Sequence, residues 1–198
     1  MTEEEWLASA GAPAMLTWLL SDQAIQADIK RPSDRKLRLF ACECLRSIWS
    51  DLSAPNQAYV NWQQSHPDEA PADQPQERRG LAEHLRRGAA KTVLGVVTAT
   101  RERPSRPGGI PPTRQAELLR EVVGNPFRPV TVSPAWLTAD VLRLAGGAYD
   151  ECRFDDLPIL ADALEEAGCD ASGLLGHLRG PGPHVRGCRA LDLVLGKS

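Results

Sequence analysis

Residues 33–52, SDRKLRLFACECLRSIWSDL, decide the fold class of this chain. Apolar residues recur here three, four and seven positions apart, which is the spacing of one face of an α-helix. These residues are Leu37, Phe40, Ala41, Cys44, Leu45, Ile48, Trp49 and Leu52. Ser33 is placed to cap the helix, and Pro32 disfavours a helical conformation in the residue before it. The pattern predicts a central amphipathic helix over 33–52.

The other face of this helix is predicted to lie in solvent. Its charged residues are Arg35, Lys36, Arg38, Glu43 and Arg46. Such a mixture is more typical of a solvated helical face than of a binding patch. Cys42 is predicted on the flank of the helix and Cys44 in the apolar stripe, about 200° apart, so these two thiols are not expected to hold one ion.

The rest of the chain also has helical character. Further helices are predicted from Thr2 to near Gly11, from Pro13 onward, over 56–64 and 77–101, from Thr113 to Gly124, from Thr138 through Tyr149, from Asp156 to Glu166, over 170–178, and from Pro183 to Leu195. Two Pro-rich segments, 65–76 and 103–112, are predicted to be loops. Since no convincing strand pattern occurs, we expect an all-α fold, with 1–198 as a single domain of about seven to nine helices.

Composition indicates a globular protein of the cytoplasm. The 198 residues are 42% hydrophobic and 25% charged, close to globular averages. No run of eighteen apolar residues occurs, and the acidic start Met1-Thr2-Glu3-Glu4-Glu5 does not resemble a signal peptide. Five cysteines, an odd number, favour reduced thiols over a disulfide framework. We therefore expect a cytoplasmic location and no membrane partner.

Four strings of the sequence carry a resemblance to a known family. They are SDRKLRLFAC at 33–42, GNPFRPV at 124–130, LPILADALEEAGC at 157–169 and HVRGC at 184–188. In this order they resemble the hallmark strings of an expanded family of uncharacterised bacterial proteins of planctomycete type. The resemblance implies a shared helical fold and cytosolic residence, and it supplies no catalytic residue. Where similar sequences read Cys-x-Cys-Cys and Gly-Cys-Trp, this chain has Cys42-Glu43-Cys44-Leu45 and Gly187-Cys188-Arg189.

The last quarter of the chain holds the candidate metal ligands Cys169, His177, His184 and Cys188. His184 and Cys188 are four residues apart, so on the predicted helix they share a face and together suit a soft divalent ion. Turns that fold back would add Cys169 and His177. The intervening lengths of seven, six and three residues match no standard zinc finger or ribbon, which favours cysteines that merely fill a core. Zinc is the candidate ion, and no other cofactor is predicted.

The same residues offer a Cys-His nucleophilic pair, formed by Cys188 with His184 or His177. Such a pair needs a thiolate of low pKa, an orienting third residue and oxyanion donors. No sequence motif supplies these, so no catalytic residue is predicted. The turn Gly180-Pro181-Gly182-Pro183 follows a helix, and its prolines lack the amides that would bind phosphate. We interpret it as the joint of a helical hairpin.

Two other surfaces are candidate binding sites. Arg78, Arg79, Arg86 and Arg87 could form a phosphate-contacting stripe on one helix. The pI near 5.8 and the few aromatics favour instead a solvated face or a partner for the acidic C-terminal third. The connector residues Phe127, Arg128 and Trp136 are predicted as an interaction surface, with Phe127 and Trp136 also packing the connector onto the core.

These features favour a non-enzymatic interaction or scaffold module that binds an unidentified protein. The first alternative is a nucleic-acid-associated protein that uses the Arg-rich segment. The second is a metal-binding protein or thiol enzyme centred on Cys188 and His184. A fold alone does not decide among them, because function resides in particular sites.

Overall fold

The computed structural model describes residues 1–69, 89–100 and 109–197. These residues hold eleven α-helices, eight of them with seven or more residues, and no β-strand. The predicted all-α class is therefore confirmed. Internal contacts group the chain into two compact units, Met1–Phe127 and Arg128–Ser198. The sequence pattern predicted 1–198 as a single domain, without this division into two units.

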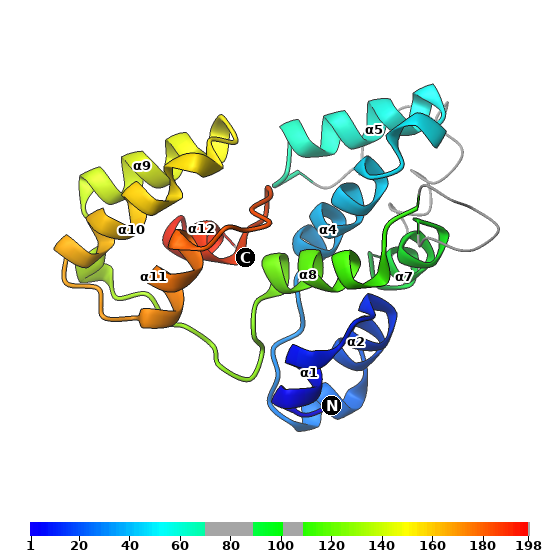
Figure 1. Ribbon diagram of the computed structural model, residues 1–198, viewed down its shortest axis with the longest axis horizontal. Helices are drawn as coiled ribbons and strands as arrows, with labels where there is room; N and C mark the ends of the chain where they lie inside the picture. The colour runs from blue at the N-terminus through cyan, green and yellow to red at the C-terminus, as the bar shows by residue number, and fades with distance from the viewer. Residues whose placement is uncertain (70–88, 101–108, 198) are drawn as a thin grey trace. The chain divides into compact units, whose positions relative to one another are not determined.

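The N-terminal unit is built around one long helix. Its elements are α1 (Glu3–Ala8), α2 (Ala12–Leu19), α3 (Asp22–Gln26), α4 (Asp34–Arg46), the 3-10 turn η1 (Trp49–Asp51), α5 (Ala54–Ser65), α7 (Ala89–Thr100) and α8 (Pro112–Val123). Helix α4 packs against α5, α7 and α8, and α2 packs against α7 and α8 (Figure 1). The buried α4 residues Leu37, Phe40 and Leu45 follow the predicted stripe.

Side-chain caps begin several helices where the sequence indicated them. Ser33 Oγ accepts a hydrogen bond from the Lys36 amide at 3.3 Å. At α1, Thr2 Oγ1 accepts from the Glu5 amide while Glu5 Oε2 accepts from the Thr2 amide, which is a capping box. The helix predicted over 33–52 nevertheless ends at Arg46. Ser47 Oγ donates to the Glu43 carbonyl and so competes for the helical backbone.

The prediction that the charged face of α4 lies in solvent is wrong for Arg35 and Arg38. Arg35 and Arg38 are each only 8% exposed, and Cys42 is fully buried. Arginine stems are long and apolar, so a helix can bury them against its neighbours while its sequence still reads as amphipathic. Lys36 donates from Nζ to the Val122 carbonyl at 2.9 Å, which ties α4 to the end of α8.

The predicted loops fall partly outside the described residues. Residues 66–69 follow the end of α5 and are not helical. Residues 109–111 precede α8, which begins at Pro112, one residue before the predicted cap Thr113. Proline suits the first turn of a helix because its missing amide hydrogen has no helical partner there. The helix predicted over 77–101 is helical from 89 to 100, the part that the structure describes.

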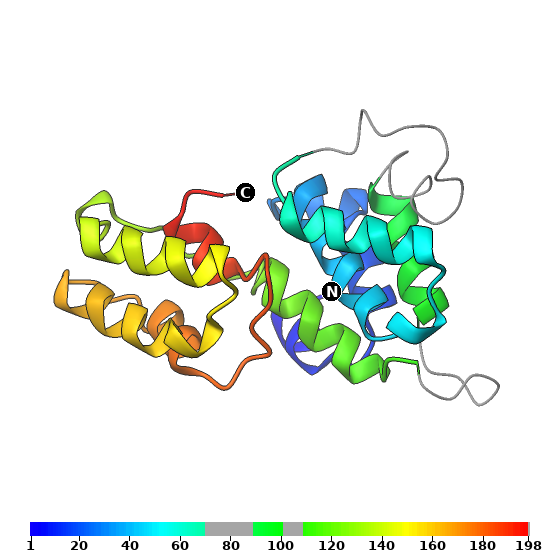
Figure 2. The same cartoon turned by 90° about the horizontal axis from the view of Figure 1, so that it is seen from above.

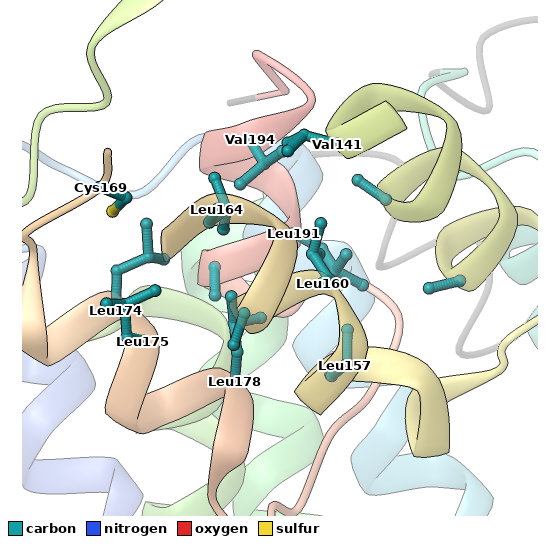
Figure 3. Packing of buried hydrophobic residues seen from close by; sticks show 14 of the residues in the cluster. Val141, Leu157, Leu160, Leu164, Cys169, Leu174, Leu175, Leu178, Leu191 and Val194 are labelled. Carbon is teal, nitrogen blue, oxygen red and sulfur yellow. The ribbon is translucent and has the colours of Figure 1, made fainter. Parts of the chain in front are cut away.

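The C-terminal unit is a smaller helical cluster. Its elements are η2 (Pro134–Trp136), α9 (Ala139–Asp150), η3 (Phe154–Asp156), α10 (Leu157–Glu166), α11 (Ser172–Arg179) and α12 (Arg189–Val194). Helices α9 and α10 lie side by side (Figure 2), and α11 and α12 pack onto them. The buried side chains form one aliphatic cluster that includes Leu160, Leu164, Leu178 and Leu191 (Figure 3).

No helix in the described ranges is long and apolar enough to cross a lipid bilayer.

Replacing Leu164 by alanine should lower the free energy of unfolding by about 2–5 kcal/mol, because truncation of a fully buried leucine leaves a cavity. Ile159→Ala on the same helix is the matched control. Its side chain is 54% exposed, so the change should cost less than about 1 kcal/mol. Urea unfolding followed by circular dichroism measures both. Equal effects of the two substitutions would contradict the packing in Figure 3.

Candidate functional site

The segment 180–188 joins α11 to α12 and is not helical. We name these residues the closing turn. The last helix was predicted to start at Pro183, and this start is wrong, because α12 begins only at Arg189. Gly182 and Gly187 both have positive φ, at 86° and 93°, a backbone conformation that interrupts a helix. His184 and Cys188 therefore do not share a helical face.

The closing turn instead brings Cys188 to His177. The Nε2 atom of His177 lies 3.2 Å from the Cys188 Sγ atom. His177 belongs to the last turn of α11, and Cys188 is the residue that immediately precedes α12. The two residues are eleven positions apart in sequence, and their contact links the end of α11 to the residue before α12.

His184 completes a cluster of three side chains. Its ring meets the ring of His177 edge to face, with centroids 5.1 Å apart and planes at 76°. The Nε2 atom of His184 lies 3.0 Å from the Gly180 carbonyl oxygen, which can only accept, so the nitrogen donates. The potential ligand atoms of His177, His184 and Cys188 all lie within 4.8 Å of one another.

The spacing of these atoms is close to what a small cation requires. Donor atoms around a tetrahedral zinc ion lie roughly 3.5 Å apart, given bonds of about 2.0–2.1 Å to nitrogen and 2.3 Å to sulfur. The 3.2 Å between His177 and Cys188 is near that value. The widest separation, at most 4.8 Å, would have to close by about 1 Å, which a modest side-chain rotation achieves. Two imidazoles and one thiol can therefore converge on one ion.

Cys169 is not part of this cluster. It is buried in the aliphatic core of the C-terminal unit, near Leu164 and Leu174 (Figure 3). Its amide donates to the Leu164 carbonyl at 2.9 Å after the end of α10. Of the four predicted ligands, the structure therefore assembles three and assigns the fourth to the core.

The Cys188 thiol is poorly placed for nucleophilic catalysis. A cysteine nucleophile must be reached by its substrate, and catalytic thiols are partly exposed. Cys188 is 0% exposed and packs within the aliphatic cluster. The contact with His177 places a base beside the Cys188 thiol, as a Cys-His pair requires. The burial of Cys188 nevertheless favours a metal ligand over a catalytic nucleophile.

The other predicted surfaces have different outcomes. Arg78, Arg79, Arg86 and Arg87 lie outside the described residues. Phe127 stacks on Trp18, with ring centroids 5.2 Å apart and planes at 15°. Trp136 packs against the aliphatic core of the C-terminal unit, and Arg128 is exposed. The two aromatic side chains of the predicted interaction surface thus make contacts within their own units.

Gly182 should not tolerate a side chain. Its φ of 86° is unfavourable for other residues, and a Cβ atom there would lie 2.5 Å from the His184 backbone nitrogen. Gly182→Ala should therefore lower the free energy of unfolding by about 1–3 kcal/mol. Gly176→Ala in α11 is the matched control, because open space surrounds that position. It should stabilise the helix by about 0.5–1 kcal/mol. A stable Gly182→Ala protein would contradict the described turn.

Thiol labelling should distinguish the five cysteines. Cys152 is exposed, whereas Cys42, Cys44, Cys169 and Cys188 are buried. Burial raises the pKa of Cys42 to about 12, so its thiol stays neutral and unreactive until the pH approaches that value. At pH 8 one thiol per native chain should react rapidly with a disulfide reagent, and Cys152→Ser should remove this phase. Rapid reaction of several thiols would contradict the burial.

Comparisons of this chain with protein-family models, with curated proteins and with solved structures give no match. The resemblance to planctomycete-type proteins stays a prediction. The functional assignment therefore depends on the cluster of His177, His184 and Cys188.

Proposed function

We propose that the C-terminal unit is a metal-binding helical module. One zinc-like divalent cation would be held by His177, His184 and Cys188. The proposal depends on the convergence of three ligand side chains within 4.8 Å, one from α11 and two from the closing turn. These residues lie within eleven positions of one another in sequence, and the fold of the closing turn brings their side chains together.

The hydrogen bond of His184 supports a role as a ligand. Histidines that bind metals usually donate their second ring nitrogen to a carbonyl or carboxylate, which fixes the tautomer and the ring orientation. His184 donates from Nε2 to the Gly180 carbonyl at 3.0 Å. In the neutral imidazole the lone pair then resides on Nδ1. The turn that positions His184 thus also selects the nitrogen that would bind the ion.

The donor set indicates the class of metal. Imidazole and thiolate ligands suit zinc and neighbouring transition metals, whereas magnesium and calcium prefer oxygen. Three protein donors leave one position of a tetrahedral ion for a further ligand. Binding would require loss of the Cys188 proton and would therefore weaken as the pH falls.

The role that fits this position is structural. An ion bound to His177 and Cys188 would connect the end of α11 to the start of α12, so it would stabilise the folded unit and not the unfolded chain. The partner of such a module stays a prediction from the sequence.

Elemental analysis tests the proposal directly. Protein purified without a metal-affinity tag should contain about one zinc per chain, or take up one from a zinc-buffered solution. Cys188→Ser and His177→Gln should each reduce this content strongly, because each removes one of three protein ligands. Zinc at about 100 times its dissociation constant should raise the free energy of unfolding by about 2.7 kcal/mol.

Two further cysteine variants are the controls. Cys152→Ser changes an exposed thiol and should leave the zinc content unchanged. Cys169→Ala changes a thiol of the aliphatic core, so it should reduce stability without reducing the zinc content. If wild-type protein takes up no zinc, or if Cys188→Ser takes up as much as wild type, the proposed site is wrong.

A further inference from the structure

Helix α4 of the N-terminal unit buries two arginines that are three residues apart. Arg35 and Arg38 are each 8% exposed, so both guanidinium groups lose most of their contact with water. Neighbours at this spacing lie on the same face of a helix, and like charges there repel. A buried charge is costly unless another group compensates it. The pair therefore requires negative charge nearby.

Arg35 has such a partner among the described residues. Arg35 Nε donates to Asp68 Oδ1 at 2.5 Å. In the described part of the chain, Arg38 Nε is enclosed and has no hydrogen-bond acceptor. Two other enclosed polar atoms lack partners, Trp6 Nε1 and Gln115 Oε1, but these belong to neutral groups. Of these three enclosed atoms without a partner, Arg38 Nε belongs to a charged side chain.

Two neutral groups lie near Arg38 in the described part of the chain. One turn further along α4 lies Cys42, and Tyr59 of α5 lies close enough for its phenol to respond to the Arg38 charge. Burial raises the pKa of both Cys42 and Tyr59, while Arg38 lowers it by a smaller amount. Both groups are therefore neutral at physiological pH. The Tyr59 hydroxyl donates to Gln63 Oε1 at 3.2 Å, so its hydrogen is already used.

We propose that Arg38 is the anchor of a binding site for a phosphate-type oxyanion at the junction of α4 and α5. The fork of an arginine side chain can donate two parallel hydrogen bonds to such a group. Arg35, on the same face of α4, adds a second positive charge nearby. The ligand would be inorganic phosphate or the phosphate group of a small phosphomonoester. This site is independent of the metal-binding cluster, and its proposal does not rest on that function.

Nuclear magnetic resonance on the intact wild-type chain tests the site. The probe is inorganic phosphate, added at constant ionic strength with chloride as the reference anion. The Arg38 Nε–H resonance should shift in a saturable way, because an enclosed donor without an acceptor would gain one. Chloride should not reproduce the shift. Glycerol phosphate forms the second arm, and tighter binding than inorganic phosphate would identify a phosphomonoester as the ligand.

Two arginine variants separate this site from general charge effects. Arg38→Gln should weaken phosphate binding by at least about tenfold, since a charged hydrogen-bond donor is lost. Arg143→Gln removes the same charge from an exposed position on α9, where Arg143 pairs with Asp140, and should leave binding unchanged. If Arg38→Gln does not fold, Arg38→Lys retains the charge without the fork and should still bind more weakly.

Two results would overturn the proposal. In the first, neither phosphate nor glycerol phosphate gives a saturable shift of the wild-type Arg38 resonance. In the second, the Arg38 and Arg143 variants lose affinity equally, which would indicate a diffuse charge effect in place of a site.

Discussion

The contact between the His177 imidazole and the Cys188 thiol is the interaction on which the C-terminal unit depends. At 3.2 Å it connects the end of α11 to the start of α12 across a turn that contains three glycines and two prolines. Glycine-rich segments lose much conformational entropy on folding, so the turn needs specific contacts to hold one conformation. Arg179 supplies another contact, since it pairs with Asp162 and Glu165 of α10 at 2.6 and 2.5 Å. Those pairs are exposed and contribute little. The part-buried contact of His177 and Cys188 adds to the packing of α12 against α9 and α11.

The N-terminal unit depends on a different constraint, the burial of one helix on most of its sides. Helix α4 contacts α5, α7 and α8, so its charged residues must find partners inside the unit or reach solvent along their stems. Lys36 finds a partner in the Val122 carbonyl, and Arg35 pairs with Asp68. Arg38 has no such partner in the described part of the chain, which is why an external anion is the occupant we infer. The two units thus carry two separate chemical features, one suited to a soft cation and the other to an oxyanion.

Periodicity predicted the elements of the fold far better than it predicted the candidate site. The stripe of α4, the caps at Thr2 and Ser33, and the all-α class depend on local rules, and the structure confirms them. The burial of Arg35 and Arg38 was missed because a hydropathy pattern counts arginine as polar wherever its stem lies. The predicted start of the last helix at Pro183 was wrong because positive φ at Gly182 and Gly187 is a property of the folded turn. For the same reason the sequence suggested four ligands, of which tertiary packing unites three and places Cys169 in the core.

Cobalt(II) substitution shows whether His177, His184 and Cys188 bind one ion together. Cobalt in a site with one thiolate and two imidazoles should give an intense sulfur-to-metal charge-transfer band and the strong visible absorption of tetrahedral coordination, at one equivalent per chain. The charge-transfer band should disappear in Cys188→Ser, while Cys169→Ala should retain it. Weak visible absorption typical of octahedral cobalt in the wild-type protein would contradict a site formed by these three residues. A charge-transfer band that persists without Cys188 would contradict it as well.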